Sequence, residues 1–164
     1  LSVEKLNFKF SVSATTRKKR DHEINGKDYF FFSQEEFKNS IENQDFIEYE
    51  KVYENMYYGT LKSEVNNLIV NHNIVFDVDV LGALSLKKYF KSLAISIFIK
   101  PPSIDVLEKR LIDRKKNEPS EIKDRIRKAE IEMKTEADFD TVIINKDLDV
   151  AKQELIDKVE EFLK

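Results

Sequence analysis

Two short apolar runs in the middle of the chain constrain its fold most. NIVFDVDV occupies residues 73–80, LAISIFI occupies residues 93–99, and a helical stretch from about Leu81 to Phe90 separates them. Both runs are rich in β-branched and aromatic residues, which is typical of strands buried on both faces of a parallel sheet. Because strand and helix alternate through the second half of the chain, we expect an α/β fold with a parallel core.

The other segments fit the same alternation. Ser33 followed by Glu36 has the spacing of a capping box, which predicts a helix that runs to about Asn43. Thr60 is expected to cap a second helix, which runs to about Val70. The remaining predicted strands cover residues 8–12, 29–32, 46–53 and 141–144, and the remaining predicted helices cover residues 103–114, 122–133 and 147–164.

Residues 13–59 interrupt the alternation of strand and helix. This segment is rich in predicted strands, and it holds five of the six tyrosines of the chain. It follows the first core strand and precedes the helix expected at 60–70. We therefore predict an inserted lobe, and segments of this kind often carry the binding site of a protein.

Charge and composition argue against several classes of protein. The chain has 28 basic and 31 acidic residues and a net charge of −3, so it lacks the cationic bias of a nucleic-acid-binding protein, and any anion site is local. It has no cysteine, which excludes disulfides and thiolate metal sites, and His22 and His72 are far apart. Without a signal-peptide pattern or an apolar run of about 18 residues, one soluble cytoplasmic domain without a membrane partner is expected.

A basic cluster follows the first predicted strand, in the stretch FSVSATTRKKR at residues 10–20. Arg17 and Arg20 are three residues apart in a loop that leaves the end of a core strand. Guanidinium groups match phosphate oxygens in bidentate fashion, so the pair could bind one phosphate group. The alternative is a solvated basic turn, as charge runs often are.

The motifs together resemble the guanylate kinases. FSVSATTRKKR, NGKDYFFFSQEEF, FIEYEKVYENMYYGT, FDVDVLGA, IFIKPPSIDVLEKRLIDR and VIINKDL occur in the order and spacing of that family, over nearly all of the 164 residues. The resemblance implies a P-loop nucleoside-monophosphate-kinase fold, in which a parallel sheet is flanked by helices. It also implies transfer of the γ-phosphoryl group of ATP, with Mg²⁺, to GMP. Its implied parts are a core (1–12, 61–109 and 130–164), a GMP-binding lobe (13–60) and a helical lid (110–129).

The resemblance also implies roles for single residues. Those expected at the GMP phosphate are Arg17, Arg20, Tyr29 and Tyr58, and those expected at the guanine are Ser13, Glu48, Thr60 and Asp79. The arginines expected to act in catalysis are Arg17, Arg110, Arg114 and Arg125. Arg114 and Asn145 are expected at ATP, and Asp77 is expected near the metal-bound phosphates, with a contact to the metal through water.

The chemistry of Glu48 agrees with its implied role. A carboxylate can accept two hydrogen bonds from the N1–H and N2 amino donors of guanine, whereas adenine offers no such pair of donors. Each of these positions also has an alternative interpretation. Glu48 could be an outward residue of an alternating strand, Asp77 and Asp79 could belong to a strand-to-helix turn, the lid arginines could line a solvated face, and Asn145 could be a turn residue.

One part of the family pattern has no match in the sequence. Guanylate kinases carry a strand and a G-x-x-x-x-G-K-[ST] loop ahead of the strand that corresponds to residues 8–12. We expect such a segment before Leu1, and a vacancy beside the strands at 8–12 and 74–79. Two alternatives to the enzyme are a guanylate-kinase-like module that holds a phosphopeptide or GMP, and a kinase for another nucleoside monophosphate. The oligomeric state is left open.

Overall fold

A computed structural model describes residues 6–53, 55–113 and 119–164. The chain divides into two compact units, Leu1–Tyr89 and Phe90–Lys164. In the described residues no helix combines the length and the apolar character needed to cross a lipid bilayer. The division into core, lobe and lid expected from the sequence stays a prediction.

The first unit contains a two-stranded parallel sheet. Its strands are β1 (Phe8–Phe10) and β6 (Asn73–Val75), and Phe8 lies opposite Asn73. The two strands are directly hydrogen-bonded to each other, and the vacancy expected beside them stays a prediction. β6 is also shorter than the predicted run at 73–80, because the side chain of Asp79 accepts the N–H of Gly82 and starts helix α3 (Val80–Phe90).

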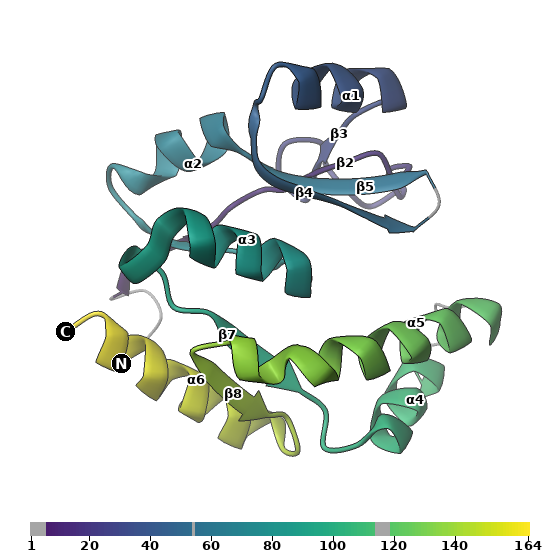
Figure 1. The fold of residues 1–164 in the computed structure, drawn as a ribbon, viewed down its shortest axis with the longest axis vertical. Helices are drawn as coiled ribbons and strands as arrows, with labels where there is room; N and C mark the ends of the chain where they lie inside the picture. The colour runs from purple at the N-terminus through teal and green to yellow at the C-terminus, as the bar shows by residue number, and fades with distance from the viewer. Residues whose placement is uncertain (1–5, 54, 114–118) are drawn as a thin grey trace. The chain divides into compact units, whose positions relative to one another are not determined.

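A four-stranded sheet forms the rest of the first unit, together with helices α1 (Gln34–Glu42) and α2 (Lys62–Ile69). The strands lie in the order β3-β2-β5-β4. They are β2 (Ala14–Thr15), β3 (Phe30–Phe31), β4 (Phe46–Tyr53) and β5 (Met56–Leu61), and only the β2–β3 pair is parallel. Figure 1 shows α1 against this sheet. Residues 13–59 are therefore rich in strands, as predicted, and this sheet with α1 is called the lobe below.

The core of this lobe is aromatic. Phe37 of α1 is 1% exposed and stacks on Phe46 with 4.5 Å between ring centroids. Ala14 and Leu61 complete the buried cluster. The predicted capping box at the start of α1 is confirmed, since the side chains of Ser33 and Glu36 each bond the other's backbone N–H. The lobe is thus held by one helix packed on the strands that carry the candidate site.

The helix expected to start at Thr60 begins later. Thr60 lies in β5, opposite Glu48 of β4, and α2 begins after Leu61 without a side-chain cap. The Thr60 hydroxyl donates to the carboxylate of Glu48 and does not accept an N–H at the start of α2. A β-branched residue such as threonine fits a paired strand well. Because Thr60 lies in β5 and α2 begins only after Leu61, the prediction that Thr60 caps this helix is wrong.

The second unit has a parallel pair of strands with helices around it. β7 (Ile97–Lys100) pairs with β8 (Thr141–Ile144), and Phe98 lies opposite Val142. The helical segments are η2 (Lys91–Leu93), α4 (Ile104–Asp113), α5 (Pro119–Glu132), η3 (Met133–Asp138) and α6 (Leu148–Phe162). The two parallel pairs and the alternating helices confirm the mixed α/β class.

Candidate functional site

The centre of the lobe holds a buried carboxylate. Glu48 is 8% exposed, and its Oε1 accepts the Thr60 hydroxyl at 2.5 Å across the β4–β5 pair. Burial raises the pKa of Glu48, and the negative charge of Asp79 adds to the rise, while the hydrogen bond from Thr60 opposes it. The alternative that Glu48 points outward from its strand is wrong. Its carboxylate retains acceptor capacity, because two oxygens offer about four lone-pair sites.

Two other residues expected at the guanine belong to the same unit. Asp79 directly precedes α3, and its Oδ1 accepts the N–H of Gly82 at 3.0 Å. Asp79 contributes to the raised pKa of Glu48, so the two carboxylates act on each other electrostatically. Ser13 directly precedes β2, and its carbonyl accepts the N–H of Phe30 at 2.9 Å. The structure therefore brings Glu48, Thr60 and Asp79 together.

The basic cluster is organised by an acidic residue that the sequence analysis missed. Glu23 is 7% exposed, and its two oxygens accept the Nη1 and Nη2 groups of Arg17 at 3.0 and 2.7 Å. The Arg17 guanidinium lowers the pKa of Glu23 to about 2. The N–H of Arg20 also donates to Glu23, at 2.7 Å. An acid three residues after Arg20 was the available sequence signal for this contact.

Aromatic side chains surround the Arg17 guanidinium. Its Cζ lies 5.3 Å from the ring centroid of Tyr29 and 5.6 Å from that of Phe31, distances that allow cation–π attraction. The Tyr29 and Tyr58 rings meet edge to face at 6.0 Å, and burial raises the pKa of Tyr29. The hydrogen bond that Arg17 donates to Glu23, and a weaker one that it donates to Tyr58, raise the pKa of Arg17. Two of the residues expected at the phosphate, Tyr29 and Tyr58, thus lie against a third, Arg17.

Arg20, the other residue expected at the phosphate, is more exposed to solvent than Arg17. Its side chain is 61% exposed, and its Nη1 lies 3.9 Å from Glu23, whereas the Arg17 side chain is 14% exposed. Asp77, expected near the metal-bound phosphates, adds to the raised pKa of Tyr29 through its negative charge. The solvated-turn alternative therefore describes Arg20 but not Arg17.

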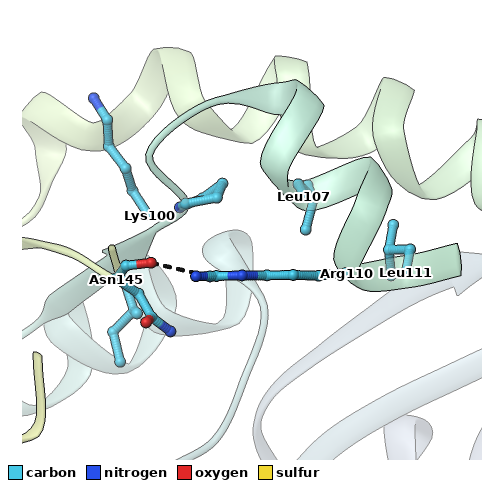
Figure 2. Close-up of a pocket in the computed structure, with 7 residues that line it drawn as sticks. Lys100, Leu107, Arg110, Leu111 and Asn145 are labelled. Atoms are coloured by element: carbon cyan, nitrogen blue, oxygen red, sulfur yellow. Dashed lines mark hydrogen bonds between the residues drawn. The ribbon is translucent and has the colours of Figure 1, made fainter. Parts of the chain in front are cut away.

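Arg110 and Asn145, two of the other predicted site residues, line a pocket in the second unit. Figure 2 shows the Arg110 guanidinium extended toward the backbone of Asn145, where Nη1 donates to the carbonyl at 3.0 Å. Nη2 donates to the carbonyl of Lys146 at 3.3 Å. The cavity has a volume of about 180 Å³. Its lining residues are Ile99, Lys100, Pro101, Leu107, Arg110, Leu111 and Asn145.

The two remaining lid arginines differ in what the structure says of them. Arg114 lies outside the described residues. Arg125 is on α5, and its buried Nε has no hydrogen-bond partner in the described part of the chain. The predicted roles of both arginines at the transferring phosphoryl group stay predictions.

Comparison with known proteins identifies the family. The family model described as guanylate kinase matches residues 1–163. The guanylate kinase of Bacteroides thetaiotaomicron is 49% identical over 99% of this chain and 80% of its own length, and that of Porphyromonas gingivalis is 44% identical over 99% and 87%. The crystal structure of guanylate kinase from Anaplasma phagocytophilum superposes with a TM-score of 0.76 at 29% identity, over 98% of this chain and 80% of that one, which confirms the predicted fold class. With its sequence matched almost from end to end and its fold shared, the chain belongs to the guanylate kinase family.

Proposed function

We propose that the protein transfers the γ-phosphoryl group of ATP to GMP, giving ADP and GDP. The observation that carries this proposal is the buried Glu48 carboxylate, which has one hydroxyl donor in Thr60 and acceptor capacity left over. The N1–H and N2 amino groups of guanine supply two donors side by side. Because burying a carboxylate without partners is costly, a base that lacks those donors is rejected.

The cluster around Arg17 supports a phosphate site in the same unit. Arg17 has five N–H donors, and Glu23 and the carbonyl of Lys18 engage its Nη groups. Of its remaining donors one reaches Tyr58 in this structure, and a phosphate would compete with Tyr58 for this side of the guanidinium. Tyr29 and Tyr58 would add hydroxyl donors, and the exposed Arg20 would approach from solvent.

The pocket of Arg110 and Asn145 supports a site for ATP in the second unit. Its lining combines apolar side chains with a guanidinium and an amide, a mixture typical of nucleotide and cofactor pockets. We assign Asn145 to this nucleotide, and Arg110, which donates to the Asn145 carbonyl, keeps its expected role in catalysis beside it. Arg114 and Arg125 keep their proposed role, in which guanidinium groups offset the charge that develops during phosphoryl transfer.

The donor set fits a magnesium ion that arrives with ATP. In the described residues there is no group of three or more His, Cys, Asp or Glu side chains that could hold a metal ion. Protein Mg²⁺ sites often use one or two carboxylates plus substrate phosphates, and Asp77 offers one such carboxylate. Bound Mg²⁺ would neutralise part of the charge on the ATP phosphates. A cytoplasmic location and the lack of a nucleic-acid partner stay predictions.

One assay tests the proposed reaction. ADP release from ATP is measured with the full chain in the presence of GMP, AMP or no acceptor. We expect release that depends on GMP and is far slower with AMP. Equal rates with AMP would favour a kinase of different base preference. A protein that binds GMP but releases no ADP would favour the binding-module alternative, for which the comparisons give no support.

A further inference from the structure

Gly82 lies against the two carboxylates of the guanine side. It is buried in the first turn of α3, three residues after Asp79. A Cβ built on Gly82 would lie 3.0 Å from Oε2 of Glu48 and 3.3 Å from Oδ1 of Asp79. A Cβ contact at 3.0 Å is tighter than nearly all those found in proteins, so an alanine here requires a neighbour to shift by a few tenths of an ångström.

The backbone of α3 does not explain the glycine. Gly82 has no left-handed φ, and in a helix glycine is disfavoured relative to alanine. Its N–H donates to the Asp79 side chain, and the N–H of any residue except proline could make the same hydrogen bond. What the missing side chain provides is space beside Glu48.

We propose that Gly82 is a specificity-determining position: its lack of a side chain leaves the Glu48 carboxylate where it can bind the guanine edge. The inference rests on the proposed GMP function. Oε2 of Glu48 is the nearest of the three atoms that the added Cβ would crowd, the others being Oδ1 of Asp79 and Cβ of Val78, both at 3.3 Å. Because the carboxylate is the end of a side chain while the helix start is fixed by the Gly82–Asp79 hydrogen bond, Glu48 is the group that would shift most readily. Hydrogen bonds to guanine depend steeply on distance and angle, so a displaced carboxylate would bind both donors less well.

The test compares GMP with IMP, which keeps the N1–H but lacks the N2 amino group. Dissociation constants are measured by calorimetry with the full chain. Gly82→Ala should raise the dissociation constant of GMP roughly tenfold, the effect of one impaired charge-assisted hydrogen bond, and should raise that of IMP by a smaller factor. Leu81→Ala is the matched control, since Leu81 is the neighbouring residue on α3 and is 56% exposed. It should leave the GMP/IMP ratio unchanged.

A second pair of variants separates a specificity role from a purely structural one. Glu48→Asp withdraws the carboxylate by one methylene and makes room for the new methyl group. Adding Gly82→Ala to Glu48→Asp should therefore cost no further selectivity, and this pair remains informative even where Gly82→Ala alone fails to fold. An equal loss in both backgrounds, or an unchanged ratio in Gly82→Ala, would overturn the inference. Wild-type protein that does not prefer GMP to IMP would instead refute the proposed function.

Discussion

Replacing Glu48 with glutamine tests most directly how the base is read. Glutamine has nearly the same shape, and the Thr60 hydroxyl that now bonds Oε1 can bond the amide. One charge-assisted hydrogen bond to guanine is lost, about 1.5–3 kcal/mol, and an amide donor then faces a guanine donor, which adds about 1–3 kcal/mol. Together these cost about 2.5–6 kcal/mol, or roughly sixtyfold to twenty-thousandfold in the Kd of GMP.

Calorimetric titration with GMP and AMP measures this effect. The affinity for AMP should not fall, because an amide can both donate to N1 and accept from the N6 amino group of adenine. Glu35→Gln is the control, since it removes the same charge from an exposed position in the first turn of α1. A folded Glu48→Gln protein that binds GMP within about threefold of wild type would refute the reasoning, because a lost charge-assisted hydrogen bond costs more than that.

Three further changes test the lobe. Because the pKa of Glu23 falls to about 2 from an ordinary 4.5, its stabilising effect is present above pH 4.5 and is lost as the pH falls toward 2. Denaturation midpoints of wild type and Glu23→Gln should therefore converge over that interval. Phe37→Ala should lower the free energy of unfolding of the lobe by about 3–5 kcal/mol, because it removes a ring that is 1% exposed and stacked on Phe46. Hydrogen exchange of the lobe amides measures this loss, and a loss below about 1 kcal/mol would contradict the packing. Arg20→Ala should weaken GMP binding by about 1.5–3 kcal/mol and leave the thermal midpoint unchanged. Arg17→Ala should lower both the GMP affinity and the thermal midpoint, because it leaves buried Glu23 unpaired. Unchanged GMP affinity in both variants would argue against a phosphate site.

Local signals predicted much of the fold. The Ser33 capping box and the two apolar runs with a helix between them depend on residues close in sequence. The structure confirms the capping box and the helix, and each run contains a strand, although the strands cover only Asn73–Val75 and Ile97–Lys100. The errors arise where a distant residue decides the outcome. Thr60 looked like a helix cap until its strand partner Glu48 was known.

The candidate site shows the same division between local and distant information. The residue types at Glu48 and Arg17 suggested a base contact and a phosphate contact from the sequence and the family resemblance. The contact between Glu23 and Arg17 requires the loop to turn back on itself, and the closeness of Gly82 to Glu48 requires α3 to meet the β4–β5 pair. Neither arrangement follows from residue spacing alone.

The antiparallel pairing of β4 and β5 has a consequence for how the lobe assembles. Glu48 and Thr60 are separated by 12 positions, whereas the bond between Thr15 and Tyr57, which joins β2 to β5, spans 42. Closing the shorter loop costs less chain entropy, and contacts that are local in sequence form sooner. The hairpin with Glu48 would therefore form before β2 docks beside it. A newly made chain would then bring Glu48 to Thr60 before β2 joins the sheet.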